Sequence, residues 1–311
     1  MTTLIFGARG FIGRRLTPLL RDEGDEVVEV FSGGPTIDST DPGIRRVRCD
    51  LRRFDQVVEL MLNVRPERTI NLAYNLGNDH PPHEAQQLNV VGMDNFFEAS
   101  RLADVEHVVF ASSLAANGLQ SNFGERAVTE DDPLMGSTYQ YATHKVFNEW
   151  QANDYRDKYG MRITSIRPAN VAGHDKVIGS VDHVQCIVAP ALGEAVSFPF
   201  ADAMRCSIHV DDVALAFSRI ARSTPQHTAY NTGGNTTSLI DLAEVVRTFI
   251  PDADITFRAE SGAKAGSTNY IIDNSRLRSE YGIAPLGLRE MVLKIANDAR
   301  AEHGLAPIAG D

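Results

Sequence analysis

A glycine-rich turn near the start of the chain constrains the fold more than any other feature of the sequence. The segment Gly7-Ala8-Arg9-Gly10-Phe11-Ile12-Gly13 follows a short apolar run and precedes a stretch in which apolar residues recur near the helical period. Glycines let a backbone turn tightly and approach a pyrophosphate, and the helix N-terminus that follows offers free N–H groups and about half a positive charge. This strand, turn and helix predict a dinucleotide site, with a plain tight turn as the alternative.

Strand and helix patterns alternate through the first two thirds of the chain, which predicts βαβ units and a parallel sheet covered on both faces. From about Gly173 the pattern breaks into shorter pieces that carry several prolines. We therefore predict an α/β fold with a Rossmann doubly wound parallel sheet and a smaller, partly discontinuous α/β substrate domain. The dinucleotide-binding domain comprises residues 1–172 with 206–232 returning to it, and the substrate-binding domain comprises 173–205 and 233–311. The predicted strands are 3–6, 27–31, 69–73, 107–112 and 162–167, and the predicted helices are 11–21, 56–62, 89–102 and 140–159.

Composition excludes several classes of function. The formal net charge of −11 argues against sequence-independent binding of nucleic acid, which needs a basic surface. An anionic ligand must therefore be held locally. No apolar run approaches the ~18 residues of a membrane span, so we expect no membrane partner. The cysteines form no Cys-x-x-Cys pair and indicate neither a disulfide framework nor a metal site, so we expect a cytoplasmic protein: Cys49, Cys186 and Cys206.

The end of the second predicted strand bears on the choice of cofactor. An acidic residue there accepts hydrogen bonds from the ribose of NAD, but the chain has Phe31 followed by Ser32. Nothing at this position repels a 2′-phosphate, and Arg9 in the glycine loop supplies a positive partner. The sequence predicts binding of NAD or NADP, with a preference for NADP.

Tyr141 and Lys145 place a phenol and an ammonium one helical turn apart, on the same face of a predicted helix. Such a pair arises by chance in many helices. Its significance increases because Ser112 and Ser113 follow a predicted strand, and side chains at the carboxyl edge of a parallel sheet face the ligand crevice. The tyrosine, lysine and serines therefore form a candidate catalytic group.

With these residues the sequence resembles the extended short-chain dehydrogenase/reductase family, the group that includes nucleotide-sugar epimerases and dehydratases. The resemblance covers nearly the whole chain. In chain order it rests on the glycine loop, Asp50-Leu51, Asn71-Leu72-Ala73, Asn89-Val90-Val91-Gly92, Ala111-Ser112-Ser113, the Tyr141/Lys145 pair with Glu149, Arg167-Pro168-Ala169-Asn170-Val171-Ala172-Gly173 and Ile208-His209-Val210-Asp211-Asp212.

The resemblance implies an enzyme in which Tyr141 acts as general acid or base on a substrate hydroxyl or carbonyl. A free phenol has a pKa of about 10, and Lys145 together with the oxidised nicotinamide would lower that pKa. Ser113 would hydrogen-bond the same substrate oxygen, and Asn89 would order a proton-relay water. We expect cofactor contacts from Gly7, Arg9, Gly10, Phe11, Ile12, Gly13, Ser32, Asp50, Leu51, Leu72, Ala73, Tyr74, Ser112, Tyr141, Lys145, Pro168 and Val171, and substrate contacts from Asn75, Ser113, Asn170, His174 and Arg205.

Departures from the family pattern narrow the reaction. Family 4,6-dehydratases carry an Asp-Glu pair directly after the active-site hydroxyl residue, whereas Leu114 and Ala115 stand here. Asn170 and Arg205 match positions that contact the diphosphate in sugar epimerases. The family's Arg-Pro-Gly-Asp segment, however, is represented by residues 264–267, which read Lys-Ala-Gly-Ser, and the loop before Arg205 is short and apolar. We therefore predict an NAD(P)-dependent dehydrogenase or reductase that acts on the secondary alcohol or ketone of a small, non-nucleotide substrate.

Two alternatives remain open. A nucleotide-sugar 4-epimerase would use the same residues with retained NAD and no net redox change, and a non-catalytic regulatory protein would keep only the fold and the dinucleotide. The family relationship also implies a homodimer, in which helices 89–102 and 140–159 pair with their copies in a four-helix bundle. Tyr139 lies six residues before Lys145, so we interpret it as surface or subunit packing, and Trp150 as core or interface packing.

Overall fold

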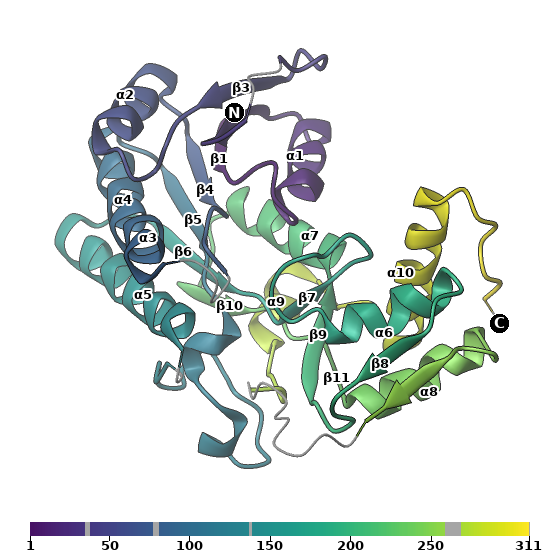
Figure 1. Cartoon of the computed structure of the whole chain (residues 1–311). Helices are drawn as coiled ribbons and strands as arrows, with labels where there is room; N and C mark the ends of the chain where they lie inside the picture. Colours follow the sequence, from purple (N-terminus) through teal and green to yellow (C-terminus); the bar gives the residue numbers. More distant parts are fainter. Residues whose placement is uncertain (35–37, 77–80, 137–138, 259–268, 311) are drawn as a thin grey trace.

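The computed structural model describes residues 1–311 except 35–37, 77–80, 137–138, 259–268 and 311. Its centre is a seven-stranded sheet in the order β10-β6-β5-β4-β1-β2-β3, in which every pairing is parallel (Figure 1). The strand order reverses between β1 and β4, as in doubly wound folds that bind ligands at the carboxyl ends of their strands. The predicted Rossmann sheet is confirmed. Its strands are β1 (Thr2–Phe6), β2 (Glu26–Phe31), β3 (Ile44–Arg48), β4 (Arg68–Asn71), β5 (His107–Ala111), β6 (Ile163–Arg167) and β10 (Ala229–Asn231).

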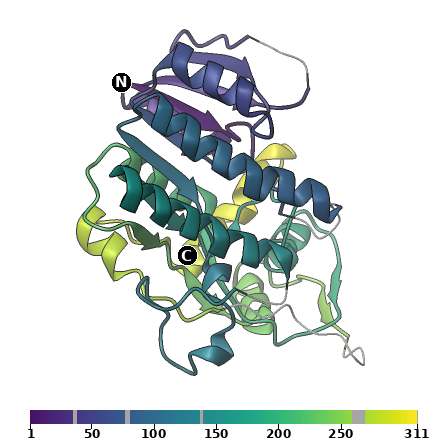
Figure 2. The same cartoon turned by 90° about the vertical axis from the view of Figure 1, so that its left-hand side faces the viewer.

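Helices cover both faces of this sheet. On one face α1 packs against α7, and on the other α2 packs against α4 and α4 against α5, the layer that faces the viewer in Figure 2. Successive strand residues alternate between the layers: Ile5 packs with the α1 and α7 residues, and Leu4 with those of α2 and α4. Burial on both faces explains why β1, at the centre of the sheet, ends in the apolar run Leu-Ile-Phe. The helices are α1 (Gly13–Asp22), α2 (Phe54–Val64), α3 (Pro82–Gln86), α4 (Gly92–Leu102), α5 (Gln140–Tyr159) and α7 (Val210–Ala221).

A third hydrophobic cluster lies beside the large sheet and is built by α6, α8 and α10 with β8 and β12 (Figure 1). A three-stranded sheet, β11-β9-β7, and a two-stranded sheet, β12-β8, accompany it. No helix in the described part of the chain is long and apolar enough to cross a membrane. The boundaries between the two predicted domains stay a prediction. The remaining elements are α6 (Asp182–Ala191), α8 (Leu239–Phe249), α9 (Ser275–Tyr281), α10 (Leu288–Glu302), β7 (Asn170–Ala172), β8 (Val196–Phe198), β9 (Arg205–His209), β11 (Asn235–Thr237) and β12 (Ile255–Phe257), with short helical turns η1 (Gln87–Val91), η2 (Leu114–Asn117) and η3 (Gln120–Asn122).

Among the differences from the predicted elements are an additional edge strand and a π-helical turn. The edge strand β3 was not predicted, because its sequence Ile-Arg-Arg-Val-Arg lacks an apolar pattern. A strand at the edge of a sheet is paired on one side only, so its charged side chains can stay in water. The predicted helix 89–102 is instead a π-helical turn, η1, followed by α4. Asn89 lies in that turn and is buried.

Candidate active site

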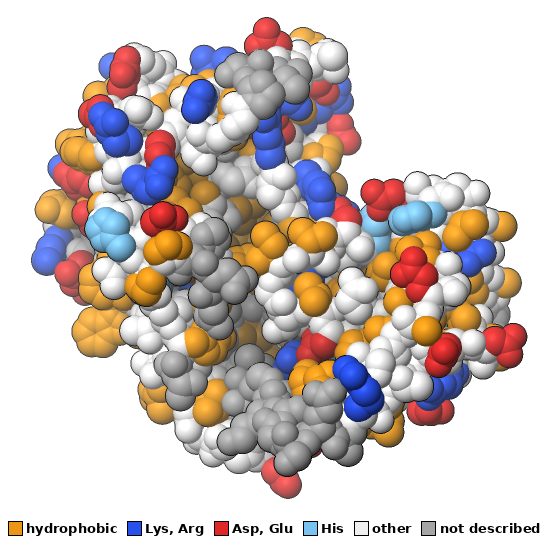
Figure 3. All heavy atoms as spheres, viewed as in Figure 1, with side chains coloured by type: hydrophobic (Ala, Val, Ile, Leu, Met, Phe, Trp, Pro, Cys, Tyr) orange, Lys and Arg blue, Asp and Glu red, His pale blue; other side chains and the backbone are white. Residues whose placement is uncertain are grey.

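A cavity of about 700 Å³ lies at the carboxyl ends of β1, β4, β5 and β6. Figure 3 shows this face of the molecule, hollowed at its centre with apolar side chains around the hollow. The glycine loop, the end of β5, α5 and the loop after β7 all contribute to the wall. The cavity brings together sixteen of the residues that the sequence singled out: Gly7, Arg9, Gly10, Phe11, Ile12, Gly13, Leu72, Tyr74, Ser112, Ser113, Tyr141, Lys145, Pro168, Asn170, Val171 and Arg205.

The glycine loop has no room for side chains at two of its three glycines. Gly7 has a φ of +78°, and a Cβ there would lie 2.7 Å from the Ala73 nitrogen. A Cβ at Gly13 would lie 2.4 Å from the Gly7 carbonyl oxygen. The Gly10 N–H donates to that same oxygen at 2.9 Å and closes the turn. The bare backbone at the start of α1 thus fits the close approach of a pyrophosphate.

Lys145 is buried on α5, one turn beyond Tyr141. Its Nζ donates to the Ala111 carbonyl oxygen at 2.6 Å and lies 3.2 Å from the centre of the Tyr74 ring and 5.5 Å from the centre of the Tyr141 ring. Burial lowers the pKa of Lys145 well below its usual value. Burial also raises the pKa of Tyr141 to about 12, opposed by hydrogen bonding with Ser113. In the protein alone the phenol is therefore neutral at physiological pH.

Two further tyrosines flank Tyr141. Tyr74 meets it edge-on at 5.5 Å between ring centres and donates its hydroxyl to Asn148 Oδ1 at 3.0 Å. Tyr139 stacks on it at 6.0 Å with an interplanar angle of 2°, and it lines the cavity. The interpretation of Tyr139 as surface or subunit packing was wrong. The helix begins at Gln140, so helical spacing does not govern the direction of the Tyr139 side chain.

A buried ion pair braces this edge of the sheet. Glu149 on α5 accepts hydrogen bonds from Arg167 Nε at 2.8 Å and Nη2 at 2.7 Å, and from Ser112 Oγ at 2.5 Å. Burial alone raises the pKa of Glu149, but the Arg167 guanidinium and these hydrogen bonds outweigh it, so the pKa lies below its usual range. The Arg167 contacts join α5 to the end of β6, and the Ser112 contact joins α5 to the end of β5, directly before Ser113.

Several predicted site residues lie outside the cavity. Asn89 accepts from the Asn75 N–H at 2.8 Å and donates to the Asn75 carbonyl oxygen at 3.0 Å, while its own carbonyl oxygen accepts from Asn148 Nδ2 at 2.8 Å. Both asparagines are thus engaged with each other, and the relay role of Asn89 stays a prediction. His174 lies against Glu302 of α10 at 3.3 Å. The structure does not bring Asn75 or His174 to the cavity wall.

Four of the expected cofactor contacts also lie outside the cavity, along or near the carboxyl edge of the sheet. Asp50 forms a two-pronged ion pair with Arg52, with Nη2 and Oδ2 2.6 Å apart. The others are Ser32, which is exposed, and Leu51 and Ala73.

The loop after β7 supplies lining residues that sequence reasoning missed. Lys176 Nζ donates to Asn170 Oδ1 and to the Ser180 carbonyl oxygen, both at 2.7 Å. Asn269 lines the opposite wall and donates to the Leu114 carbonyl oxygen. Neither Lys176 nor Asn269 belongs to a recognisable motif, so no signal in the sequence marked them. Residues 264–267, which represent the Arg-Pro-Gly-Asp segment, lie outside the described residues.

The chain is similar to known proteins over nearly its whole length. The model of the NAD dependent epimerase/dehydratase family matches residues 3–233. The UDP-glucose 4-epimerase of Mycolicibacterium smegmatis is 30% identical over 313 residues, which cover 94% of this chain and 97% of that protein. Among solved structures, the Thermus thermophilus UDP-glucose 4-epimerase in complex with NAD has a TM-score of 0.81 at 23% identity and covers 96% of this chain and 99% of its own. The L-threonine 3-dehydrogenase of Trypanosoma brucei has a TM-score of 0.83 at 20% identity and covers 98% of this chain and 99% of its own.

Proposed function

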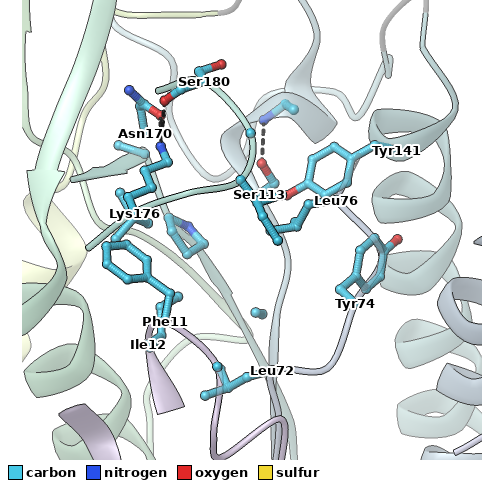
Figure 4. A pocket seen from close by; sticks show the side chains of 18 of the residues that line it. Phe11, Ile12, Leu72, Tyr74, Leu76, Ser113, Tyr141, Asn170, Lys176 and Ser180 are labelled. Atoms are coloured by element: carbon cyan, nitrogen blue, oxygen red, sulfur yellow. Dashed lines mark hydrogen bonds between the residues drawn. The ribbon is translucent and has the colours of Figure 1, made fainter. Parts of the chain in front are cut away.

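The chain belongs to the NAD-dependent epimerase/dehydratase family, and from this premise we propose that it is an NAD(P)-dependent oxidoreductase acting on the secondary alcohol or ketone of a small, non-nucleotide substrate. One observation carries the proposal: Ser113, Tyr141 and Lys145 share a single cavity with the glycine loop. A reacting group and a dinucleotide cradle on the same cavity wall are what hydride transfer requires. Figure 4 places Ser113 and Tyr141 side by side on that wall.

Each of the three residues has a distinct part in the proposed reaction. The nicotinamide, when bound, accepts or supplies the hydride. Tyr141 takes the proton from the substrate hydroxyl during oxidation and returns one to the oxygen during reduction. Lys145, whose Nζ lies 5.5 Å from the Tyr141 ring centre, would stabilise the phenolate together with the oxidised nicotinamide and so oppose the rise in the Tyr141 pKa that burial causes. Ser113 holds the same substrate oxygen by a hydrogen bond.

Contacts around Arg205 support a substrate without a nucleotide diphosphate. The Arg205 guanidinium donates to Asp182 Oδ2 at 2.8 Å and to the Met204 carbonyl oxygen at 3.1 Å. Asn170 Oδ1 is engaged by Lys176. Arg205 and the Asn170 side-chain oxygen, which match diphosphate-binding positions, are therefore engaged at these atoms by other groups of the protein.

The wall next to Ser113 also argues against dehydration. Elimination needs an additional acid and base, but Leu114 and Ala115 follow Ser113 and line the cavity. Among the described lining residues Asp175 carries the one carboxylate, and Arg14 and Arg15 both pair with it.

A second candidate is a nucleotide-sugar 4-epimerase, favoured by the relative from Mycolicibacterium smegmatis, which matches this chain over nearly its full length. An epimerase oxidises and re-reduces one carbon, so its cofactor shows no net change. A third candidate, a regulatory protein that binds the dinucleotide without chemistry, would not need the Tyr141 and Lys145 pair. The three functions therefore predict different cofactor behaviour.

One experiment separates them. The purified protein is tested for bound NAD and then incubated with NAD⁺ or NADP⁺ and a panel of hydroxy acids, sugar acids and UDP-glucose, while cofactor absorbance and product configuration are followed. We expect stoichiometric reduction of the cofactor with one of the non-nucleotide compounds and its loss in Tyr141→Phe. Tyr159→Phe, which changes an exposed phenol on the same helix, is the matched control. Retained NAD with conversion of UDP-glucose and no net redox change would refute the dehydrogenase.

The preference for NADP gains no support from the comparisons, since the Thermus thermophilus structure is a complex with NAD. It rests on Arg9, whose guanidinium lies 3.9 Å above the Phe31 ring, and on Arg48, the neighbour of Phe31 across β2 and β3. Two cations at the end of β2 favour a 2′-phosphate. Titration of the protein with NADH and NADPH decides the preference, and equal or tighter binding of NADH contradicts it.

We also propose a homodimer formed through α4 and α5. Apolar side chains on this face are exposed: Val91 by 39%, Phe147 by 48% and Trp150 by 65%. Trp150 is therefore not a core residue, and of the two interpretations, core packing and interface packing, we propose the second. Trp150→Asp should convert a dimer to a monomer in light scattering; a monomeric wild-type protein overturns the proposal.

A further inference from the structure

Tyr74 makes a contact to which the proposed reaction assigns no part. It follows β4, lines the same cavity as Tyr141 and was expected from the sequence only to contact the cofactor (Figure 4). The Lys145 Nζ lies over the face of the Tyr74 ring, 3.2 Å from its centre, well inside the ~6 Å at which a cation and an aromatic ring attract each other. The centre of the Tyr141 ring is farther from this Nζ, at 5.5 Å. Of the two rings, Tyr74 is therefore the one in direct contact with the ammonium.

The Lys145 ammonium has few other groups to offset its burial. Its side chain belongs to a residue that is 2% exposed, and its one hydrogen bond within the described residues goes to the Ala111 carbonyl oxygen at 2.6 Å. Glu149, the carboxylate that acts on Lys145 electrostatically, is paired with Arg167 at 2.7 Å. Lys145 itself forms no ion pair with any residue that the structure describes. A buried cation without an ion pair needs another source of attraction.

The other titratable groups around Lys145 are uncharged. Tyr141 and His144 lie with it on α5, and Tyr74 comes from the loop after β4. Burial raises the pKa of both tyrosines above the ordinary value and lowers the pKa of His144, so all three groups are neutral at pH 7. The negative face of the Tyr74 ring therefore supplies an attraction that no neighbouring anion supplies in full, and such a contact is stronger where water is excluded.

The ring of Tyr74 is held in place by its own hydrogen bonds. Its hydroxyl donates to Asn148 Oδ1 at 3.0 Å, and the next residue in the chain, Asn75, donates its backbone N–H to Asn89 Oδ1 at 2.8 Å. Asn148 and Lys145 both belong to α5. The ring is thus tied to the helix that carries the ammonium, and it cannot move away from Lys145 without breaking the hydrogen bond to Asn148.

We propose that Tyr74 is a positioning residue whose ring face keeps the Lys145 ammonium charged and in place beside Tyr141. The inference rests on the proposed function, because Lys145 can stabilise the Tyr141 phenolate only while it carries its charge. Without the ring face, the buried amine should lose its proton more readily. Tyr74 acts in this role through Lys145 and touches no reacting atom.

The test follows the ionisation of Lys145 rather than turnover. The chain contains five lysines, so protein labelled with ¹³C at the lysine Cε gives few resonances, and Lys145→Met identifies the one that belongs to Lys145. Its chemical shift is followed against pH in the wild type, in Tyr74→Phe, which keeps the ring, and in Tyr74→Leu, which removes it. Tyr139→Leu is the matched control, because the Tyr139 ring stacks on Tyr141 but makes no cation–π contact with Lys145 among the described residues.

We expect Lys145 to titrate about one pH unit or more lower in Tyr74→Leu than in the wild type, and close to the wild-type pH in Tyr74→Phe and Tyr139→Leu. An unchanged titration in Tyr74→Leu would overturn the proposal, as would an equal change in Tyr139→Leu. A change in Tyr74→Phe as large as that in Tyr74→Leu would assign the effect to the hydroxyl and also overturn it.

A measurement on the wild type covers the case in which Tyr74→Leu does not fold. Protons held over the face of an aromatic ring resonate upfield because of the ring current. The ε-methylene protons of Lys145 should therefore resonate upfield of those of Lys158 and Lys294, which pair with carboxylates. Signals at the same position for all three lysines would overturn the contact.

These outcomes are independent of the oxidoreductase proposal. If Lys145 titrates lower in Tyr74→Leu but the protein turns over no compound of the panel, the role of Tyr74 at Lys145 is kept and the proposed activity is lost. If the protein reduces the cofactor but Lys145 titrates alike with and without the Tyr74 ring, the activity is kept and the role of Tyr74 is lost.

Discussion

Removing the charge of Glu149 should destabilise the fold far more than removing the charge of a similar glutamate at the surface. Glu149 and Arg167 are 6% and 3% exposed, and two hydrogen bonds join them. Glu149→Gln leaves the Arg167 guanidinium buried without its carboxylate, which costs about 3–5 kcal/mol. Glu98 and Arg101 form the same two-pronged contact at 29% and 31% side-chain exposure, where an ion pair contributes about 0–1 kcal/mol.

Urea denaturation at neutral pH measures this difference. With an m value of about 3 kcal/mol per molar, the midpoint of Glu149→Gln should fall by about 1–1.7 M, and that of Glu98→Gln by about 0.3 M or less. The pH dependence has a defined sign. The fold holds the pKa of Glu149 below its unfolded value, so its contribution is present above about pH 4.3 and is lost as the pH falls through the folded value. The gap between wild type and Glu149→Gln should therefore narrow in acid.

Equal midpoints for the two glutamine variants would refute the reasoning. A double variant, Glu149→Leu with Arg167→Met, provides a second check in case Glu149→Gln does not fold. Replacing both members of a buried pair by apolar residues is often nearly neutral, so the double variant should unfold at a higher urea concentration than Arg167→Met alone. A double variant less stable than that single variant would also contradict the argument.

Three further predictions concern the site and the thiols. Gly13→Ala should abolish NADH binding, because its Cβ would lie 2.4 Å from the Gly7 carbonyl oxygen, whereas Gly33→Ala, which meets no atom within 4 Å, should not; measured by fluorescence titration, equal binding would contradict the cradle. The Tyr141 phenol, with a pKa of about 12 in the protein alone, should ionise at lower pH once NAD⁺ is bound. Ultraviolet difference titration against Tyr141→Phe measures this, and an unchanged pKa contradicts the proposed role. Burial raises the pKa of all three thiols, Cys49, Cys186 and Cys206, to about 12. A thiol reagent should therefore modify the protein only after denaturation, and rapid labelling of the native protein would contradict this prediction.

Features that depend on neighbours in the sequence were predictable. The glycine loop needs bare backbone at fixed positions after a strand, and a phenol and an ammonium four residues apart share one helix face whatever the rest of the fold does. The strand β3 escaped prediction because its arginines are tolerated only at the edge of a sheet, a position that no local pattern reveals. Tyr139 was misassigned because α5 begins one residue later, at Gln140, so that helical spacing does not set the direction of the Tyr139 side chain.

The sequence by itself determined the doubly wound sheet, the dinucleotide loop and the candidate reacting group, because periodicity, glycine placement and helical spacing act over a few residues. Only the tertiary structure brought Lys176 and Asn170 to the wall opposite Tyr141, and only it turned Asn75 and Asn89 toward each other rather than toward the cavity. Those arrangements depend on how the loop after β7 and the π-helical turn pack against elements far away in the chain. Long-range packing of this kind leaves no periodic signal in the sequence, so no local pattern could predict these arrangements.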